Sequence, residues 1–209
     1  MRIVVSVQHP DAVELAIASG ADIIELRLDL MKGDLPDIVE RIRANTDVPL
    51  LATLRSRNEG GRFEGDVDAW LEAIRPLVRF VDMVDVETGF RLHVPSFRDR
   101  GVQIVASLHT TGMPTREELE GIDQTLRGFG DIPKIVVQPR THEDVIELLS
   151  FTYSARKPIC TSIMGEGFRF ARALFPLFGS ELAFCHAGTP TAKGQYHVEE
   201  FKLLMRMLQ

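Results

Sequence analysis

The chain alternates between short apolar segments and amphipathic segments from one end to the other, and this alternation limits its possible folds more than any other feature. Eight apolar runs of strand length are each followed by a segment with helical periodicity. Strands separated by helices in this way form a parallel sheet with right-handed crossovers. The predicted strands are Arg2–Val7, Ala21–Asp29, Pro49–Ser56, Phe80–Glu87, Val102–His109, Lys134–Gln138, Pro158–Gly165 and Glu181–Gly188.

The intervening segments complete eight strand–helix units. The predicted helices are Asp11–Ser19, Pro36–Ala44, Asp66–Leu77, Leu92–Arg100, Pro114–Phe129, Thr141–Ser154, Phe168–Phe178 and Gln195–Leu208. Because no long linker or change in composition interrupts them, residues 1–209 are predicted to form one domain. Eight units favour an α/β fold, a single compact (β/α)8 or TIM barrel. An open doubly wound sheet is the alternative, but no G-x-G-x-x-G fingerprint follows the first strand.

Charge and apolar content limit the classes of partner. The net charge of −6 does not favour nucleic acid or an anionic membrane surface, although a few local arginines can still bind a small anion. The segment Met1–Val7 lacks the long apolar stretch of a signal peptide, and no run reaches membrane-spanning length. The two cysteines, Cys160 and Cys185, lack metal-ligand spacing. We therefore expect a cytoplasmic protein with reduced thiols.

Lys134 lies inside one of the predicted buried strands, within a short apolar run that also contains Pro133 and ends at Pro139. Lysine is rarely buried without a partner. Burial disfavours the charged ammonium and leaves an amine that can attack a carbonyl carbon. The alternative is that Lys134 lies at the strand edge with its amino group in water.

Other polar side chains occupy the carboxyl ends of predicted strands, where barrel enzymes carry their active sites. In the second strand, Glu25, Arg27 and Asp29 alternate with leucines and so share one face. The other candidates are Arg55 and Glu59 at and after the third strand, His109 at the end of the fifth, Arg172 after the seventh, and Thr191 and Gln195 after the eighth.

Each of these residues has a structural explanation when it is taken alone, such as an ion pair or a hydrogen-bonded histidine. Their convergence on one mouth favours a single active site. A lysine can form an imine with a carbonyl, a histidine can move a proton, a glutamate can orient that histidine, and an arginine can bind an anionic group.

The residues leave other functions open. Gly165 and Gly188 lie in loops after the seventh and eighth strands, where many barrels bind phosphate. A Schiff-base aldolase or another phosphate-binding TIM-barrel enzyme is therefore one alternative. A barrel that binds a ligand without turnover is another, and the combination of Lys134, His109 and Glu59 argues against it.

Over almost its whole length, the sequence resembles the type I 3-dehydroquinate dehydratases, the Schiff-base class of the shikimate pathway. The matching segments are Ala21–Asp29, Thr53–Ser56, Glu59–Gly61, Ser107–His109, Asp131–Ile135, Phe178–Ser180 and Thr191–Gln195. The resemblance implies a homodimeric hydro-lyase that converts 3-dehydroquinate to 3-dehydroshikimate, on the route to chorismate and the aromatic amino acids. It also implies that no metal or dissociable cofactor takes part.

The resemblance further implies a role for each candidate. Lys134 would form the imine, His109 would act as general acid and base, and Glu59 would orient His109. Arg172 would bind the substrate carboxylate. The other implied substrate contacts are Ser6, Glu25, Arg27, Arg55, Thr191 and Gln195. Three positions depart from the residues common in the family, because Ala171 and Thr191 stand in place of serines and Lys193 in place of a proline.

Overall fold

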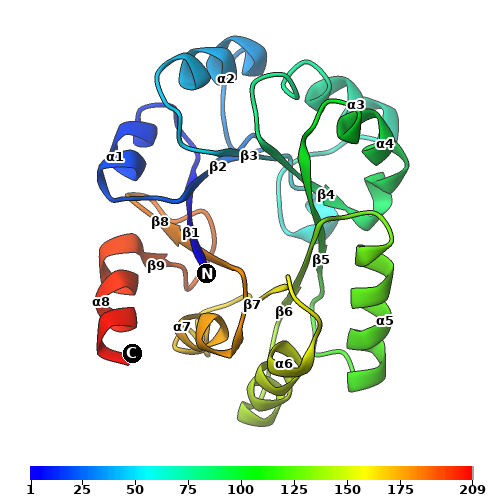
Figure 1. Ribbon diagram of the computed structural model, residues 1–209, viewed down its shortest axis with the longest axis vertical. Helices are drawn as coiled ribbons and strands as arrows, with labels where there is room; N and C mark the ends of the chain where they lie inside the picture. The colour runs from blue at the N-terminus through cyan, green and yellow to red at the C-terminus, as the bar shows by residue number, and fades with distance from the viewer. Residues whose placement is uncertain (209) are drawn as a thin grey trace.

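The computed structural model describes residues 1–208 and contains eight parallel strands arranged around a barrel (Figure 1). The strands are β1 (Arg2–Val7), β2 (Ile23–Arg27), β3 (Leu50–Thr53), β4 (Met83–Glu87), β5 (Gln103–His109), β6 (Ile132–Val137), β7 (Cys160–Ile163) and β8 (Leu182–His186). Hydrogen bonds join them in the order β7-β6-β5-β4-β3-β2-β1-β8. The predicted parallel barrel is confirmed, with each strand within a few residues of its expected position.

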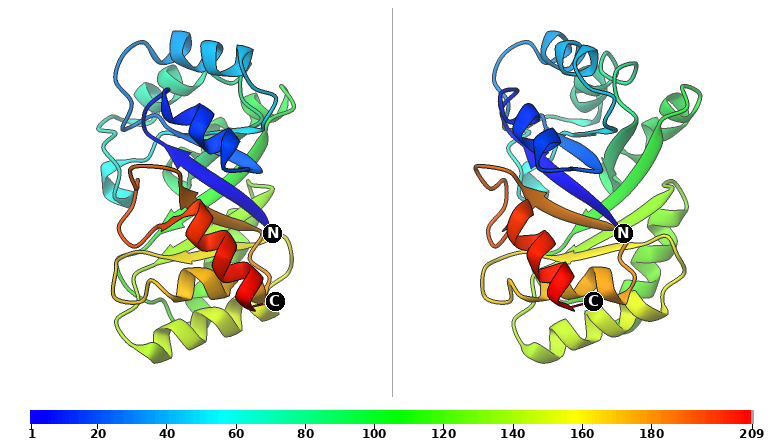
Figure 2. Two further views of the ribbon diagram at one scale, coloured as in Figure 1. Left: turned by 90° about the vertical axis from the view of Figure 1, so that its left-hand side faces the viewer. Right: turned by 60° about the vertical axis from the view of Figure 1, so that its left-hand side comes forward.

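Helices surround the barrel and cover its outer face (Figures 1 and 2). They are α1 (Ala12–Ala18), α2 (Leu35–Ala44), α3 (Val67–Ile74), α4 (Val94–Arg98), α5 (Arg116–Arg127), α6 (His142–Ser154), α7 (Ala171–Leu174) and α8 (Val198–Leu208). Side-chain caps fix where two of these helices begin. Asp34 caps α2 just before Pro36, and Thr115 forms a capping box with Glu118 at the start of α5.

Two predicted helices are each divided into shorter pieces. The segment after β4 divides into a 3-10 helix, η2 (Thr88–His93), and α4, and the segment after β7 divides into α7 and η3 (Phe175–Phe178). Pro95 lies in the first turn of α4 and Pro176 in that of η3. Because proline has no N–H to donate, each segment breaks into two short pieces.

A further difference from the prediction is a ninth strand. Tyr196 and His197 form β9, which pairs in parallel with the end of β8, and α8 begins only at Val198. Among residues 1–208, β7 and β8 share no strand ladder, so one edge of β8 is open to another partner. The backbone of β9 satisfies part of that edge.

The barrel interior has an apolar floor. One buried side chain from each of the eight strands forms a cluster, namely Val4, Ile23, Leu51, Met83, Val105, Ile132, Cys160 and Leu182. Two residues further along each strand, the side chains point to the same side and are mostly polar. They are Ser6, Glu25, Thr53, Asp85, Ser107, Lys134, Ser162 and Phe184. The floor therefore supports a polar layer on its carboxyl side.

The two cysteines lie in different layers. Cys160 belongs to the apolar floor inside the barrel, whereas Cys185 belongs to the larger core between the sheet and the helices. Both are free thiols, as the sequence predicts.

Ser180 joins β7 to β8 where the ladder is missing. Its Oγ accepts a hydrogen bond from the backbone N–H of Thr161 at 3.1 Å and lies 3.3 Å from the carbonyl oxygen of Leu182. The backbone N–H of Glu181 donates to the carbonyl of Ile159 at 2.7 Å. These contacts close the barrel at its weakest junction.

We expect Ser180→Ala to lower the free energy of unfolding by about 1–3 kcal/mol, because it leaves the buried N–H of Thr161 without a partner. Urea denaturation measures this change. Ser150→Ala, an exposed serine on α6, is the matched control and should change stability by less than about 0.5 kcal/mol. Equal stabilities of the two variants would contradict a closing role for Ser180.

Candidate active site

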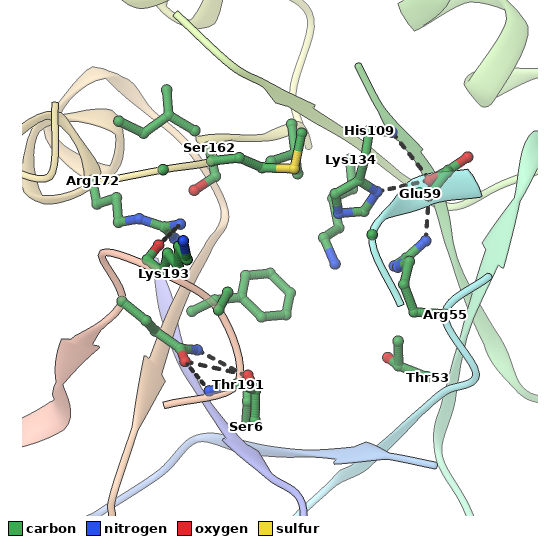
Figure 3. Close-up of a pocket in the computed structure, with 18 of the residues that line it drawn as sticks. Ser6, Thr53, Arg55, Glu59, His109, Lys134, Ser162, Arg172, Thr191 and Lys193 are labelled. Atoms are coloured by element: carbon green, nitrogen blue, oxygen red, sulfur yellow. Dashed lines mark hydrogen bonds and ion pairs between the residues drawn. The ribbon is translucent and has the colours of Figure 1, made fainter. Parts of the chain in front are cut away.

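A cavity of about 430 Å³ opens at the carboxyl ends of the strands, above the apolar floor (Figure 3). All ten candidates named from the sequence line this cavity. They are Lys134, His109, Glu59, Ser6, Glu25, Arg27, Arg55, Arg172, Thr191 and Gln195. The barrel therefore brings together side chains from its first to its last strand–helix unit.

Lys134 projects into this cavity from the middle of β6. It is only 4% exposed, so the alternative of a lysine at the strand edge is wrong. Its Nζ lies 2.9 Å from Oδ2 of Asp85 and 4.1 Å from the centre of the Phe184 ring. The amino group is thus held between a carboxylate and an aromatic face, at the bottom of the cavity.

Asp85 and Glu87, on β4, are two buried carboxylates behind the cavity lining that the sequence interpretation missed. Both bind Arg55, whose guanidinium nitrogens lie 2.7 Å from Oδ1 of Asp85 and 3.0 Å from Oε1 of Glu87. The signal was present, because in Val84–Glu87 apolar and acidic residues alternate as they do in the second strand. Alternation of charged side chains in a buried strand predicts an inward charged face.

Burial and charge act against each other in this cluster. Burial disfavours the charge of Arg55, but Asp85, Glu87 and Glu59 outweigh it and raise the pKa of the guanidinium. Burial would likewise raise the pKa of Asp85, but Arg55 and Lys134 hold it well below its usual range. Asp85 therefore stays ionised at pH 7.

His109 and Glu59 form a second pair at the rim of this cluster. Nδ1 of His109 lies 2.8 Å from Oε2 of Glu59, and the backbone N–H of His109 donates to the same oxygen at 3.1 Å. Burial, Arg55 and Lys134 hold the pKa of the imidazole well below 6.5, so the ring is neutral at pH 7. The contact at Nδ1 leaves Nε2 as the nitrogen available to a ligand.

Glu59 reaches this position through a tight loop after β3. A Cβ at Gly61 would lie 2.1 Å from the carbonyl oxygen of Arg55, so only glycine lets the chain fold back there. Burial raises the pKa of the Glu59 carboxyl to about 8, with Arg55 opposing the change and Glu87 adding to it. The pair therefore combines a weakly acidic carboxyl with a neutral imidazole.

Side chains from β1, β2 and β3 form another part of the polar layer above the apolar floor. Glu25 accepts hydrogen bonds from the hydroxyls of Ser6 and Thr53, and Nε2 of Gln195 donates to Ser6 Oγ at 3.2 Å. Arg27 binds Asp29 through two parallel contacts of 2.9 and 2.8 Å. The second strand therefore presents one carboxylate and one guanidinium, both held in place, to the cavity.

The segment Thr191–Gln195 covers the cavity mouth and is attached to its walls. Arg27 donates to the carbonyl of Thr191 at 3.3 Å, and Oε1 of Gln195 accepts from the N–H of Thr191 at 3.0 Å. A Cβ at Gly194 would lie 2.4 Å from the carbonyl oxygen of Gly165, so the loops after β7 and β8 touch. The segment and both loops form one continuous rim.

Arg172 stands on the other side of the cavity from Lys134 and His109 (Figure 3). Its NH2 donates to the carbonyl of Lys193 at 3.2 Å, and its buried Nε has no hydrogen-bond partner. Within residues 1–208, no carboxylate pairs with it. Burial lowers its pKa to about 10, so it remains a cation at pH 7. An uncompensated guanidinium facing a cavity is a binding site for an anion.

Residues 1–208 contain no group of three or more histidine, cysteine, aspartate or glutamate side chains placed to hold a metal ion. In the same range, no helix is both long and apolar enough to cross a membrane. The expectation that the site works without a metal stays a prediction.

The fold and the cavity define a (β/α)8-barrel protein whose cavity lies at the carboxyl ends of its strands, where enzymes of this fold carry their active sites. A family model described as type I 3-dehydroquinase matches residues 4–209. The 3-dehydroquinate dehydratase of Methanoregula boonei is 49% identical over 208 residues, covering 100% of both chains. The chain belongs to the type I 3-dehydroquinase family, and the prediction of an enzyme of this family is confirmed.

Solved structures of two further proteins are similar to this chain. The 3-dehydroquinate dehydratase from Geobacillus kaustophilus has a TM-score of 0.92 at 24% identity and covers 100% of this chain and 91% of its own. A type I 3-dehydroquinate dehydratase from Clostridium difficile, with covalent modified comenic acid, has a TM-score of 0.89 at 26% identity. That match covers 99% of this chain and 92% of the other.

We expect the Glu59 carboxyl to titrate with a midpoint at about pH 8. Carbon-13 NMR of protein labelled at glutamate carboxyls measures this midpoint, and Glu59→Gln identifies the resonance. Glu87→Gln removes a nearby negative charge and should lower the midpoint. Because the folded protein holds this proton more tightly than the unfolded chain, its contribution to stability is present below about pH 4.5 and is lost as the pH rises through 8. A midpoint below pH 5 would contradict the effect of burial.

Proposed function

We propose that this chain dehydrates 3-dehydroquinate to 3-dehydroshikimate through an imine on Lys134, as the third step of the shikimate pathway. The observation that carries the proposal is the pairing of two groups in one cavity of about 430 Å³. A buried amine lies on one side, and Arg172, a cation without a carboxylate partner among the described residues, lies on the other. A substrate with a ketone and a carboxylate matches both groups.

Family membership supports this assignment, since the relatives are named for the same reaction. The structure from Clostridium difficile carries covalent modified comenic acid, which supports covalent chemistry as a property of such sites. In this chain, the group suited to covalent bonding with a ketone is Lys134.

Substrate binding would use both sides of the cavity. Arg172 binds the carboxylate through charge-assisted hydrogen bonds, which its unpartnered Nε is free to make. The ring hydroxyls then meet the polar groups between Arg172 and Lys134. Those groups are Glu25, Arg27, Arg55 and Gln195, with Ser6 and Thr191 as further contacts.

Imine formation joins Nζ of Lys134 to the ketone carbon, and the carbonyl oxygen leaves as water. The product is a positively charged iminium, which draws electrons from the adjacent carbon and makes its proton more acidic. His109 assists by moving protons to and from the intermediate, because its imidazole is neutral and can accept one.

Elimination follows from the same geometry. Nε2 of His109 takes the proton from the carbon next to the iminium, and the electron pair forms an enamine. The enamine expels the β-hydroxyl, to which His109 returns a proton, so that one molecule of water leaves. Hydrolysis of the imine then releases 3-dehydroshikimate and restores the amine of Lys134. No metal or dissociable cofactor enters these steps.

Lys134→Ala should lower turnover of 3-dehydroquinate by about 10⁴-fold or more, because the imine cannot form. With the unchanged protein, sodium borohydride in the presence of 3-dehydroquinate should reduce the imine and add a stable mass to the peptide that contains Lys134. Mass spectrometry of the digested protein locates that adduct.

The control for the Lys134 experiment is Lys32→Ala, which removes an exposed lysine and should keep both turnover and the adduct. A Lys134→Ala protein with full activity would refute the proposal. Cleavage of a sugar phosphate in preference to dehydration of 3-dehydroquinate would instead favour the alternative of a Schiff-base aldolase.

Arg172→Gln should raise KM for 3-dehydroquinate by about 10- to 100-fold, because a charge-assisted contact to the carboxylate is lost. Steady-state kinetics measure this change. Arg169→Gln is the matched control, since Arg169 pairs with Glu200 and lies outside the cavity. A KM that rises equally in both variants would show that Arg172 does not recognise the carboxylate.

A further inference from the structure

Asp85 is the only carboxylate within ion-pair distance of Lys134 in the part of the chain that the structure describes. One of its oxygens, Oδ2, lies 2.9 Å from Nζ of Lys134. The other, Oδ1, lies 2.7 Å from Arg55 and accepts a hydrogen bond from Ser107 Oγ at 2.6 Å. Three partners, from β5, β6 and the loop after β3, therefore fix the carboxylate, and one of them is the amino group of Lys134.

We propose that Asp85 is the fixed counter-ion of the iminium on Lys134. This proposal rests on the proposed function and names a residue for the step that forms and keeps the covalent intermediate. Formation of the iminium places a positive charge on Nζ, so a carboxylate 2.9 Å from that atom stabilises the charge as it develops.

The surroundings of Asp85 exclude a different use of the same carboxylate. Arg55, in the loop after β3, and Lys134, on β6, keep it ionised, so it is a poor acceptor for a proton from substrate. His109 from β5 also faces it, while Glu25, Glu59 and Glu87 face the neighbouring Arg55. Proton transfer is left to His109, and Asp85 supplies a charge that does not change during turnover.

Asp85 also pairs with Arg55, but that structural role does not depend on Asp85 alone. Arg55 also contacts Glu87 at 3.0 Å and Glu59 at 3.2 Å, so it keeps two acidic partners without Asp85. Lys134 has no second carboxylate among residues 1–208. Loss of Asp85 therefore acts most strongly on the charge at Nζ.

Asp85→Asn tests this inference, and Glu87→Gln is its matched control. Both variants remove one carboxylate partner of Arg55, but only Asp85 touches Lys134. The measurement is the rate at which borohydride traps the adduct on Lys134 in the presence of 3-dehydroquinate. We expect Asp85→Asn to slow trapping by about 100-fold or more and Glu87→Gln by less than about fivefold.

A binding measurement separates this effect from general damage to the site. Quinate has the carboxylate and ring hydroxyls but no ketone, so it cannot form an imine. Its dissociation constant, measured by calorimetry, should change by less than about threefold in Asp85→Asn, because Arg172 is untouched. A structural role would weaken quinate binding and adduct trapping together.

The results of these experiments separate the counter-ion role of Asp85 from the proposed function. If the unchanged protein forms no adduct on Lys134, the proposed function fails. If it forms the adduct but Asp85→Asn is trapped at the same rate, or Glu87→Gln is slowed as much, the counter-ion role is overturned while the proposed function stands. If Asp85→Asn does not fold, Ser107→Ala decides, because it loosens Asp85 without removing a charge. It should slow trapping by about three- to tenfold, and an unchanged rate would overturn the role.

Discussion

The structure depends above all on a buried cluster of charges at the centre of the barrel. Arg55 and Lys134 share Asp85, and Glu87 completes the coordination of Arg55. Buried charges are costly unless each one is paired and hydrogen-bonded, and here the pairing joins the loop after β3 to β4 and β6. The apolar floor beneath the cluster excludes water from one side. The cavity above it therefore has a strong and fixed electrostatic field.

That field accounts for the unusual state of the neighbouring groups. Burial together with this field keeps the imidazole of His109 neutral, and burial makes Glu59 a weak acid, so a proton can move at this rim near neutral pH. At the opposite wall of the cavity, the positive charge of Arg172 is not balanced in the same way, because its buried Nε has no hydrogen-bond partner. One side of the cavity is suited to chemistry at a carbonyl and the other to holding an anion.

The sequence predicted much of the fold and of the site, and the features that it did not predict have physical causes. Alternating apolar and charged residues predicted the inward face of β2, and the same rule applied to Asp85 and Glu87 would have found them. Prolines divided the predicted helices after β4 and β7. The strand β9 was unpredictable because it exists only where β7 leaves the edge of β8 unpaired.

The sequence by itself determined the order of strands and helices and which side chains face the barrel interior, because both follow from local periodicity. It also placed the ten candidate residues on one end of the fold. Only the tertiary structure decided which charges meet. The contact between Lys134 and Asp85 and that between His109 and Glu59 each join residues about fifty positions apart. Whether such groups pair, as these do, or remain unpartnered, as Arg172 does, depends on distances that exist only once the barrel has closed.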